Sequence, residues 1–131
     1  MLISFYTLPN CEASELTRVA FLRAGIPFTE RSAVDQSPLE APVVSTIVDR
    51  HIVAWRGHRA DMIDLLADLI SDGPVPAHGL REREAAEEAV LTRFQVMQEI
   101  RAHQLSAEDF FADHGNHPLY RGRDVLNWLG Y

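Results

Sequence analysis

The sequence predicts an α/β fold, with a β-α-β-β-β-α core over residues 1–70 followed by a helical C-terminal extension. Two patterns lead to this prediction. Apolar residues alternate as in strands in several core segments, and they recur at helical spacing elsewhere in the core and throughout the extension. The chain has 131 residues, of which 47% are hydrophobic and 24% charged. This composition is typical of a globular protein and excludes a disordered one.

The first strand and the first helix are expected at residues 1–6 and 12–24. Residues 1–6 carry apolar side chains on both faces, as an interior strand does. Pro9 ends this strand. Over residues 12–24 the apolar positions recur at helical spacing, and Gly25 provides the C-terminal stop. The chain therefore begins with a strand, a tight loop and a helix.

Three further strands and a second helix complete the predicted core. The strands are expected at residues 28–34, 42–48 and 51–55, and the helix at residues 61–70. Asp49 and Arg50 turn the last two strands into a hairpin. Only the polar hexapeptide 35–40 separates the first two of these strands.

Beyond residue 72 the pattern becomes wholly helical. Residues 73–80 contain two prolines and two glycines, which is typical of a linker. A long amphipathic helix is expected at 81–104, a short one that begins at Ser106, and a last one at 124–129. We therefore expect a domain at 1–72, a linker at 73–80 and a helical extension at 81–131 that packs on the core or on a partner.

Charge and composition exclude several functional classes. The formal net charge is −7, and all 12 basic residues are arginine, so we expect no nucleic-acid partner and no step that depends on lysine. No apolar run approaches the roughly 20 residues that span a bilayer. We expect no membrane association and a cytoplasmic location. The single cysteine excludes an internal disulfide and a four-cysteine zinc site.

Cys11 is the residue at which chemistry is expected. It lies between the first strand and the first helix, where unpaired backbone N–H groups and the helix dipole stabilise a thiolate. The alternative is a small buried or incidental cysteine. His114 and His117 form a His-x-x-His pair beside Asp113, but no fourth ligand has a defined spacing, and we expect no metal there. His51 and His58 are either proton-transfer partners or ordinary strand-edge and loop residues.

Four segments together resemble the glutaredoxins, and especially the glutaredoxin-like NrdH redoxins. The run Tyr6-Thr7-Leu8-Pro9-Asn10-Cys11-Glu12-Ala13-Ser14 resembles their Tyr-Thr-x-Pro-x-Cys-x-x-Cys loop. Residues 24–28 are similar to the family's helix-to-strand step, and residues 41–44 to its cis-proline segment. Residues 51–63 resemble the stretch that leads into the last helix. The resemblance covers residues 1 to about 70.

This resemblance implies a thioredoxin-like fold of the glutaredoxin type in which Cys11 is the attacking thiol. It also implies a groove that holds the extended backbone of a substrate, with Pro42 as its cis-proline. The residues that it assigns to this groove are Tyr6, Pro9, Pro42, Val43, Trp55 and Arg56.

The chain departs from the family pattern at three places. Ser14 takes the place of the second, resolving cysteine and could donate a hydrogen bond to the Cys11 thiolate, so the resolving thiol must come from outside. Leu8 takes the place of a lysine that helps to hold glutathione. Residues 35–40 replace a whole helix, so one sheet face is expected to be uncovered, and we hypothesise that the helix at 81–104 covers it on its own chain or in a dimer.

Two functional classes fit these features. The first is a monothiol glutaredoxin-like thiol–disulfide oxidoreductase, which acts through Cys11 on a protein or small-molecule disulfide. It needs no bound cofactor; a low-molecular-weight thiol or a thioredoxin-reductase-like partner resolves the product. The alternative is a binding or regulatory module with reduced catalysis, whose helical tail engages a protein partner. A homodimer and a shared iron–sulfur cluster are left open by the sequence.

Overall fold

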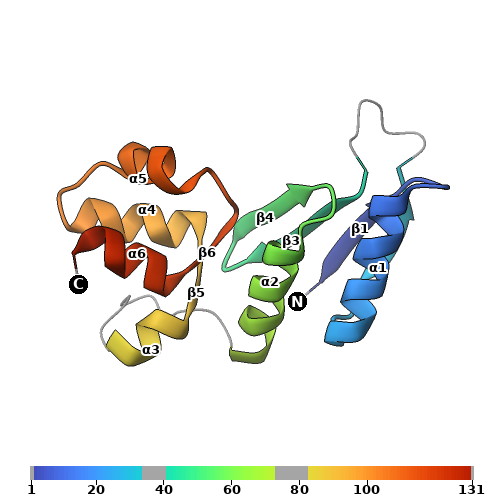
Figure 1. The fold of residues 1–131 in the computed structure, drawn as a ribbon, viewed down its shortest axis with the longest axis horizontal. Coiled ribbons are helices and arrows are strands. Elements are labelled where there is room, and N and C mark those ends of the chain that lie inside the picture. Colours follow the sequence, from blue (N-terminus) through green and yellow to red (C-terminus); the bar gives the residue numbers. More distant parts are fainter. Residues whose placement is uncertain (1, 34–40, 73–82, 131) are drawn as a thin grey trace. The chain divides into compact units, whose positions relative to one another are not determined.

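A computed structural model of the chain describes residues 2–33, 41–72 and 83–130 (Figure 1). The chain divides into two compact units, Met1–Ala67 and Asp68–Tyr131. The expected linker at 73–80 lies outside the described residues. No helix in the described ranges is both long enough and apolar enough to cross a membrane.

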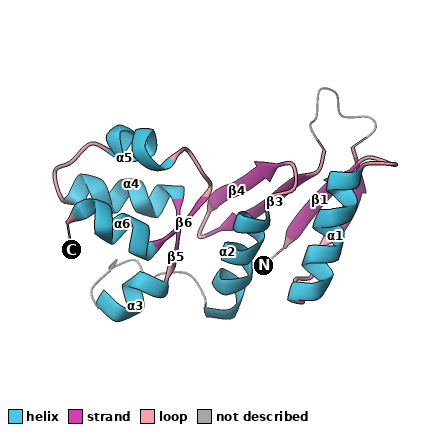
Figure 2. Ribbon diagram, viewed as in Figure 1, coloured by secondary structure: helices cyan, strands magenta, loops and turns pink. Residues whose placement is uncertain are grey.

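The first unit is built on a four-stranded sheet with the strand order β2-β1-β3-β4. The central strand β1 (Ile3–Thr7) pairs parallel with β2 (Thr29–Ser32) and antiparallel with β3 (Val43–Val48), and β4 (His51–Arg56) pairs antiparallel with β3. Helix α1 (Glu12–Ala24) connects the two parallel strands, and α2 (Ala60–Asp72) follows β4 (Figure 2). This order and these directions are those of a thioredoxin-like fold of the glutaredoxin type, which confirms the predicted fold class.

One face of this sheet is covered by helices. Alternate residues of β1, β3 and β4 are buried, among them Phe5, Val44 and Val53, because successive side chains of a strand point to opposite faces. Phe5 meets Phe21 of α1 edge to face, with ring centroids 5.4 Å apart. Figures 1 and 2 show α1 and α2 on this same side of the sheet. The opposite face is therefore the one that α1 and α2 leave open.

Helix α1 ends where the sequence predicts. Gly25 adopts a left-handed conformation with φ of 70°, which favours glycine. Its N–H donates to the carbonyl of Leu22, and the Ile26 N–H donates to the carbonyl of Phe21. These bonds satisfy carbonyl groups that the last helical turn leaves without partners. The segment 35–40, which is expected to replace a helix of the family, lies outside the described residues.

The second unit contains short helices and a two-stranded ladder. In chain order its elements are α3 (Arg83–Glu88), β5 (Val90–Thr92), α4 (Arg93–Ala102), α5 (Ala107–His114), β6 (Leu119–Arg121) and α6 (Gly122–Leu129). Strands β5 and β6 are antiparallel, with Leu91 opposite Tyr120. The core is aromatic: the fully buried ring of Phe110 contacts Tyr120 and Trp128, at centroid distances of 5.3 and 5.5 Å. This unit therefore has a hydrophobic core of its own.

The prediction of one long helix at 81–104 is wrong. The chain instead forms α3, leaves the helix to build β5, and begins α4 after Thr92. The Thr92 side chain accepts from the Gln95 N–H, and the Gln95 side chain accepts from the Thr92 N–H, which makes a capping box. Val90 and Leu91 are buried beside β6 rather than on a helix face. The strand pairing and the cap together outweigh the helical spacing of the apolar residues.

The start of α5 is the one that the sequence predicts. Ser106 caps α5, since its Oγ accepts from the Asp109 N–H at 3.4 Å. The buried Tyr120 hydroxyl donates to the Gly115 carbonyl at 2.5 Å and accepts from the His117 N–H at 2.7 Å. These bonds fix the loop between α5 and β6. Within the described ranges no three His, Cys, Asp or Glu side chains are grouped as metal ligands.

Candidate functional site

Cys11 occupies the N-cap position of α1. Its backbone is extended, with φ of −108° and ψ of 113°, and its carbonyl accepts from the Glu15 N–H at 3.1 Å. The thiol is half-buried and forms no disulfide. It therefore lies at the positive end of the helix dipole, next to the N–H groups of the first turn.

The pKa of the Cys11 thiol is lowered, and Ser14 is the main cause. A hydrogen bond from the Ser14 side chain contributes most, followed by the Ser14 backbone N–H, with a smaller contribution from the Ala13 N–H. Burial acts in the opposite direction. Ser14 is itself 1% exposed, and its Oγ accepts from the Leu8 N–H at 3.5 Å. A thiolate at this position is thus stabilised by donors that the loop and the helix hold in place.

The segment that begins β3 lies beside the thiol. The Cys11 Sγ is 3.9 Å from the carbonyl oxygen of Ala41, and the Ala41–Pro42 peptide bond is cis. The carbonyl of the buried Pro42 accepts from the Gly57 N–H at 2.7 Å. The segment next to the thiol is therefore held to the turn between β4 and α2.

A hollow of about 380 Å³ opens at the start of α1. Leu8, Pro9 and Asn10 line it from the loop, and Cys11 and Ser14 line it from the first turn. Its charged lining residues are Glu12, Glu15 and Arg18. The thiol is therefore open to a small partner through a rim that carries two carboxylates and one guanidinium.

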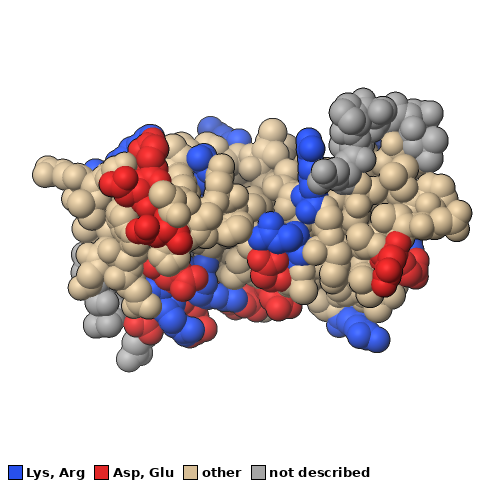
Figure 3. All heavy atoms as spheres, turned by 45° about the horizontal axis from the view of Figure 1, so that its top comes forward, with Lys and Arg blue, Asp and Glu red and all other residues tan. Residues whose placement is uncertain are grey.

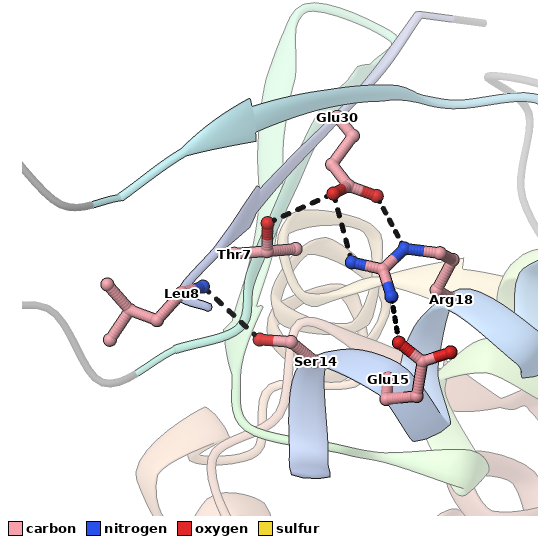
Figure 4. A network of polar contacts seen from close by, with 6 residues as sticks. All are labelled: Thr7, Leu8, Ser14, Glu15, Arg18 and Glu30. Atoms are coloured by element: carbon pink, nitrogen blue, oxygen red, sulfur yellow. Dashed lines mark hydrogen bonds and ion pairs between the residues drawn. The ribbon is translucent and has the colours of Figure 1, made fainter. Parts of the chain in front are cut away.

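Arg18 is engaged by a network that ties α1 to β2 (Figure 4). Its guanidinium donates to both Glu30 carboxylate oxygens, at 2.7 and 2.9 Å, and also pairs with Glu15. The Thr7 hydroxyl donates to Glu30 at 3.2 Å. Hydrogen bonding to Arg18 lowers the pKa of Glu30, whereas burial raises it. The network anchors the helix whose first turn holds the thiol.

The residues predicted for the substrate groove fall into separate places. Pro9 lines the hollow with Cys11. Tyr6, Val43 and Arg56 form one cross-strand row on the open face of the sheet, at the end near Cys11. Trp55 is buried on the opposite, helix-covered face, where its Nε1 has no hydrogen-bond partner among the described residues.

The structure also shows polar contacts that the sequence analysis did not identify. Thr17, one turn after Ser14, is fully buried, and its Oγ1 lies 3.0 Å from His58 Nδ1. Arg59 pairs with Asp61 through two hydrogen bonds. The spacing of Glu15 and Arg18 predicts an ion pair on one helix face. The bond from Arg18 to Glu30 depends on strand placement, which local spacing does not give.

Comparison with known proteins gives a structural likeness. No family model matches the chain, and no curated protein matches it. Among solved structures, the chain is similar to that of the glutaredoxin-like protein NrdH-redoxin from Escherichia coli. The two share 28% sequence identity with a TM-score of 0.43, and the match covers 58% of this chain and 100% of that one.

Proposed function

We propose that the chain is a monothiol thiol–disulfide oxidoreductase that acts through Cys11. The observation that carries this proposal is the setting of the thiol: an accessible cysteine at a helix N-cap, with its pKa lowered chiefly by the Ser14 side chain. Thiolates are the nucleophilic form of cysteine, so a lowered pKa increases the reactive fraction near neutral pH. A buried structural cysteine has neither property.

The reaction is a thiol–disulfide exchange in two steps. The Cys11 thiolate attacks one sulfur of a substrate disulfide, forms a mixed disulfide with that half, and releases the other half as a thiolate that takes up a proton. An external thiol, as its thiolate, then attacks the substrate sulfur of the mixed disulfide. That step forms a new disulfide between the external thiol and the substrate half, and it regenerates the Cys11 thiolate.

The second thiol must come from another molecule because this chain has one cysteine. The Ser14 hydroxyl lies where a resolving thiol would be needed, and a hydroxyl cannot form a disulfide. Its contribution is instead to stabilise the attacking and the leaving Cys11 thiolate. A low-molecular-weight thiol or a reductase of a reducing, cytoplasmic compartment is the proposed source.

The segment at Ala41, Pro42 and Val43 is the proposed contact for the substrate backbone. Ala41 places its carbonyl 3.9 Å from the thiol, so an extended segment bound here would bring its disulfide to Cys11. The rim carboxylates of Glu12 and Glu15 favour a neutral or cationic partner over an anionic one. Arg18 does not offset this preference, because two carboxylates already engage it.

Ellman's reagent, a symmetrical aromatic disulfide, tests the proposal. The protein should release one equivalent of the coloured thiolate and hold the other half on Cys11. Excess monothiol should then free Cys11 by attacking the aromatic sulfur, and a second molecule of the monothiol should release the second coloured equivalent from the mixed disulfide so formed. The rate should titrate below the free-cysteine pKa of about 8.5. Ser14→Ala should move this titration to higher pH, and Cys11→Ser should release nothing. A titration at the free-cysteine pKa in the wild-type protein would contradict catalysis and favour a binding module.

Turnover distinguishes catalysis from simple reactivity. With a cysteine peptide in mixed disulfide with cysteamine as substrate and excess cysteamine as the external thiol, the wild-type chain should accelerate release of the peptide thiol catalytically. Cys11→Ser serves as the matched control, since serine retains nearly the same volume without the nucleophile. Accelerated release of the peptide thiol that stops after one equivalent per protein chain would overturn the proposed cycle.

A further inference from the structure

The open face of the four-stranded sheet is organised in three cross-strand rows. The row farthest from Cys11 consists of Ile47 and Ile52, and Leu2, just before β1, lines the same hollow as Ile47. The middle row consists of small residues, Ser4, Ser45 and Ala54. The row nearest Cys11 is formed by Arg31, Tyr6, Val43 and Arg56. Size and polarity therefore change stepwise along the strands.

The far row is an aliphatic patch that α1 and α2 of the first unit leave uncovered. Leu2, Ile47 and Ile52 are 75%, 66% and 76% exposed, and Ile47 and Ile52 are direct cross-strand partners. A hollow of about 260 Å³ runs from Leu2 and Ile47 to the small residues Ser4 and Ser45. Adjacent exposed aliphatic side chains on a strand face are a feature of protein interaction sites.

The charges on this face have a single sign. Arg31 in β2 and Arg56 in β4 are exposed, and neither forms an ion pair with another described residue. The strand residues of this face include no aspartate or glutamate. Glu30, the acidic residue of β2, points to the opposite face, where it bonds to Arg18. The charged strand residues of the open face are therefore all basic, although the chain has a formal net charge of −7.

We propose that this face binds an amphipathic helix of a partner protein that is apolar at one end and acidic at the other. Its apolar residues cover Leu2, Ile47 and Ile52, its backbone approaches the small middle row, and its carboxylates meet Arg31 and Arg56. Four strand residues separate the outer rows, which is about 13 Å. At a rise of about 1.5 Å per residue, the two ends of the helical motif are about nine residues apart.

Charge decides between this occupant and a second copy of the chain bound through the same face. Two copies of the open face would each bring arginines and no strand carboxylate, so the interface would lack opposite charges. An acidic helix supplies the negative charges that would pair with Arg31 and Arg56. The row nearest Cys11 shares Val43 with the proposed substrate contact, but docking does not use the thiol itself, so Cys11→Ser should bind the same helix.

Two synthetic probes test the inference on the full chain. One is a fluorescein-labelled helical peptide with glutamates in its first turn and leucines on one face of its last two turns. The other has lysine in place of each glutamate. The acidic peptide should bind at least about tenfold more tightly by fluorescence anisotropy, because opposite charges across an interface favour the correct partner. It should also shift backbone NMR signals of β1, β3 and β4.

Variants of the face provide the decisive comparison. Ile47→Asp should weaken the acidic peptide at least about tenfold, whereas Leu22→Asp, at the 66% exposed Leu22 of α1, should not. Arg31→Glu combined with Arg56→Glu should reverse the preference between the peptides, and Arg23→Glu should not. Unchanged circular dichroism verifies folding of each variant.

Three results would overturn the inference. The first is absence of binding by the acidic peptide at about 1 mM, the limit of weak specific affinity. The second is equal binding of both peptides. The third is a concentration-dependent dimer, seen by analytical ultracentrifugation, that Ile47→Asp converts to a monomer, because the face would then belong to a second copy.

Discussion

The two units of the chain differ in how completely they bury their apolar surface. In the second unit the Phe110 ring is fully buried and contacts four other rings, those of Phe111, His114, Tyr120 and Trp128. In the first unit the sheet buries one face under helices and exposes aliphatic residues on the other. A closed core stabilises a fold, whereas exposed aliphatic residues on a sheet face provide apolar surface for a partner.

The two units also differ in how their polar groups are hydrogen-bonded. The buried Tyr120 hydroxyl both donates and accepts, and Thr92 and Ser106 cap the helices that follow them. In the first unit Cys11 begins α1 without a side-chain cap, and the backbone N–H groups of Ser14 and Ala13 help to lower the pKa of its thiol. Acidic side chains gather on the second unit (Figure 3), where α5 exposes Glu108, Asp109 and Asp113. The proposed chemistry and recognition therefore both belong to the first unit.

The largest expected effect comes from removing the central ring of the second unit. Phe110→Ala should cost about 3–5 kcal/mol, the usual penalty for deleting a buried phenylalanine. A unit of this size has a total stability of only about 3–10 kcal/mol. The second unit should therefore unfold largely or completely, while the Cys11 titration stays unchanged, because every member of the Phe110 core cluster belongs to the second unit.

NMR of the isotope-labelled full chain tests whether Phe110→Ala unfolds the second unit and leaves the first unit folded. Signals of β5, α4 and α6 should lose dispersion, and those of β1 and β3 should keep it. Phe94→Ala is the matched control, since Phe94 is 40% exposed. Loss of signal dispersion in both units would show that they fold as one cooperative body and would contradict the interpretation that the second unit is stabilised by a core of its own.

A smaller effect is expected from two glycine substitutions, one in each unit. In Gly122→Ala the new Cβ would lie 1.8 Å from the backbone oxygen of Ala86, so α3 and α6 must separate. We expect a cost at the upper end of about 1–3 kcal/mol. Gly25→Ala meets no atom within 4 Å, but its φ of 70° is unfavourable for alanine by about 1–2 kcal/mol.

Urea unfolding monitored by NMR assigns each loss to its unit. Gly122→Ala should shift the transition of the second unit alone, and Gly25→Ala that of the first. An unchanged transition of the second unit in Gly122→Ala would mean that the contact between α3 and α6 relaxes without cost.

The sequence predicts the first unit better than the second because its signals are local. Gly25 marks the end of α1, the dipeptide Asp49-Arg50 marks the hairpin, and the motif around Cys11 marks the thiol. Each of these depends on the preferences of a few neighbouring residues. The positions of Tyr6, Val43 and Arg56 on one face likewise follow from strand alternation.

The remaining features depend on residues that are distant in sequence. Val90, Leu91 and Thr92 form a strand only because residues 119–121 pair with them, so helical spacing alone gives the wrong element. The capping box of Thr92 and Gln95 is the local signal that could have corrected it. The bond from Arg18 to Glu30 and the buried position of Trp55 likewise depend on how strands and helices assemble.

The smallest expected effect concerns the ion pairs that hold α1 to β2. Arg18→Gln should cost at most about 1 kcal/mol at pH 7, because the Arg18 and Glu30 side chains remain 29% and 37% exposed and solvent screens the pair. Arg18 lowers the pKa of Glu30 in the folded state. The contribution is therefore complete above the unfolded glutamate pKa of about 4.3 and is lost as pH falls through the lower folded pKa.

Urea unfolding of the first unit between pH 7 and pH 3 measures this dependence. The difference between the wild-type protein and Arg18→Gln should shrink as pH falls below about 4.3, and added salt should reduce it at pH 7. Arg23→Gln, in the last turn of the same helix, should show little of either change. A difference that is the same at both pH values would mean that Arg18 stabilises α1 by packing its aliphatic stem. The network would then provide no electrostatic link between the thiol-bearing helix and the sheet.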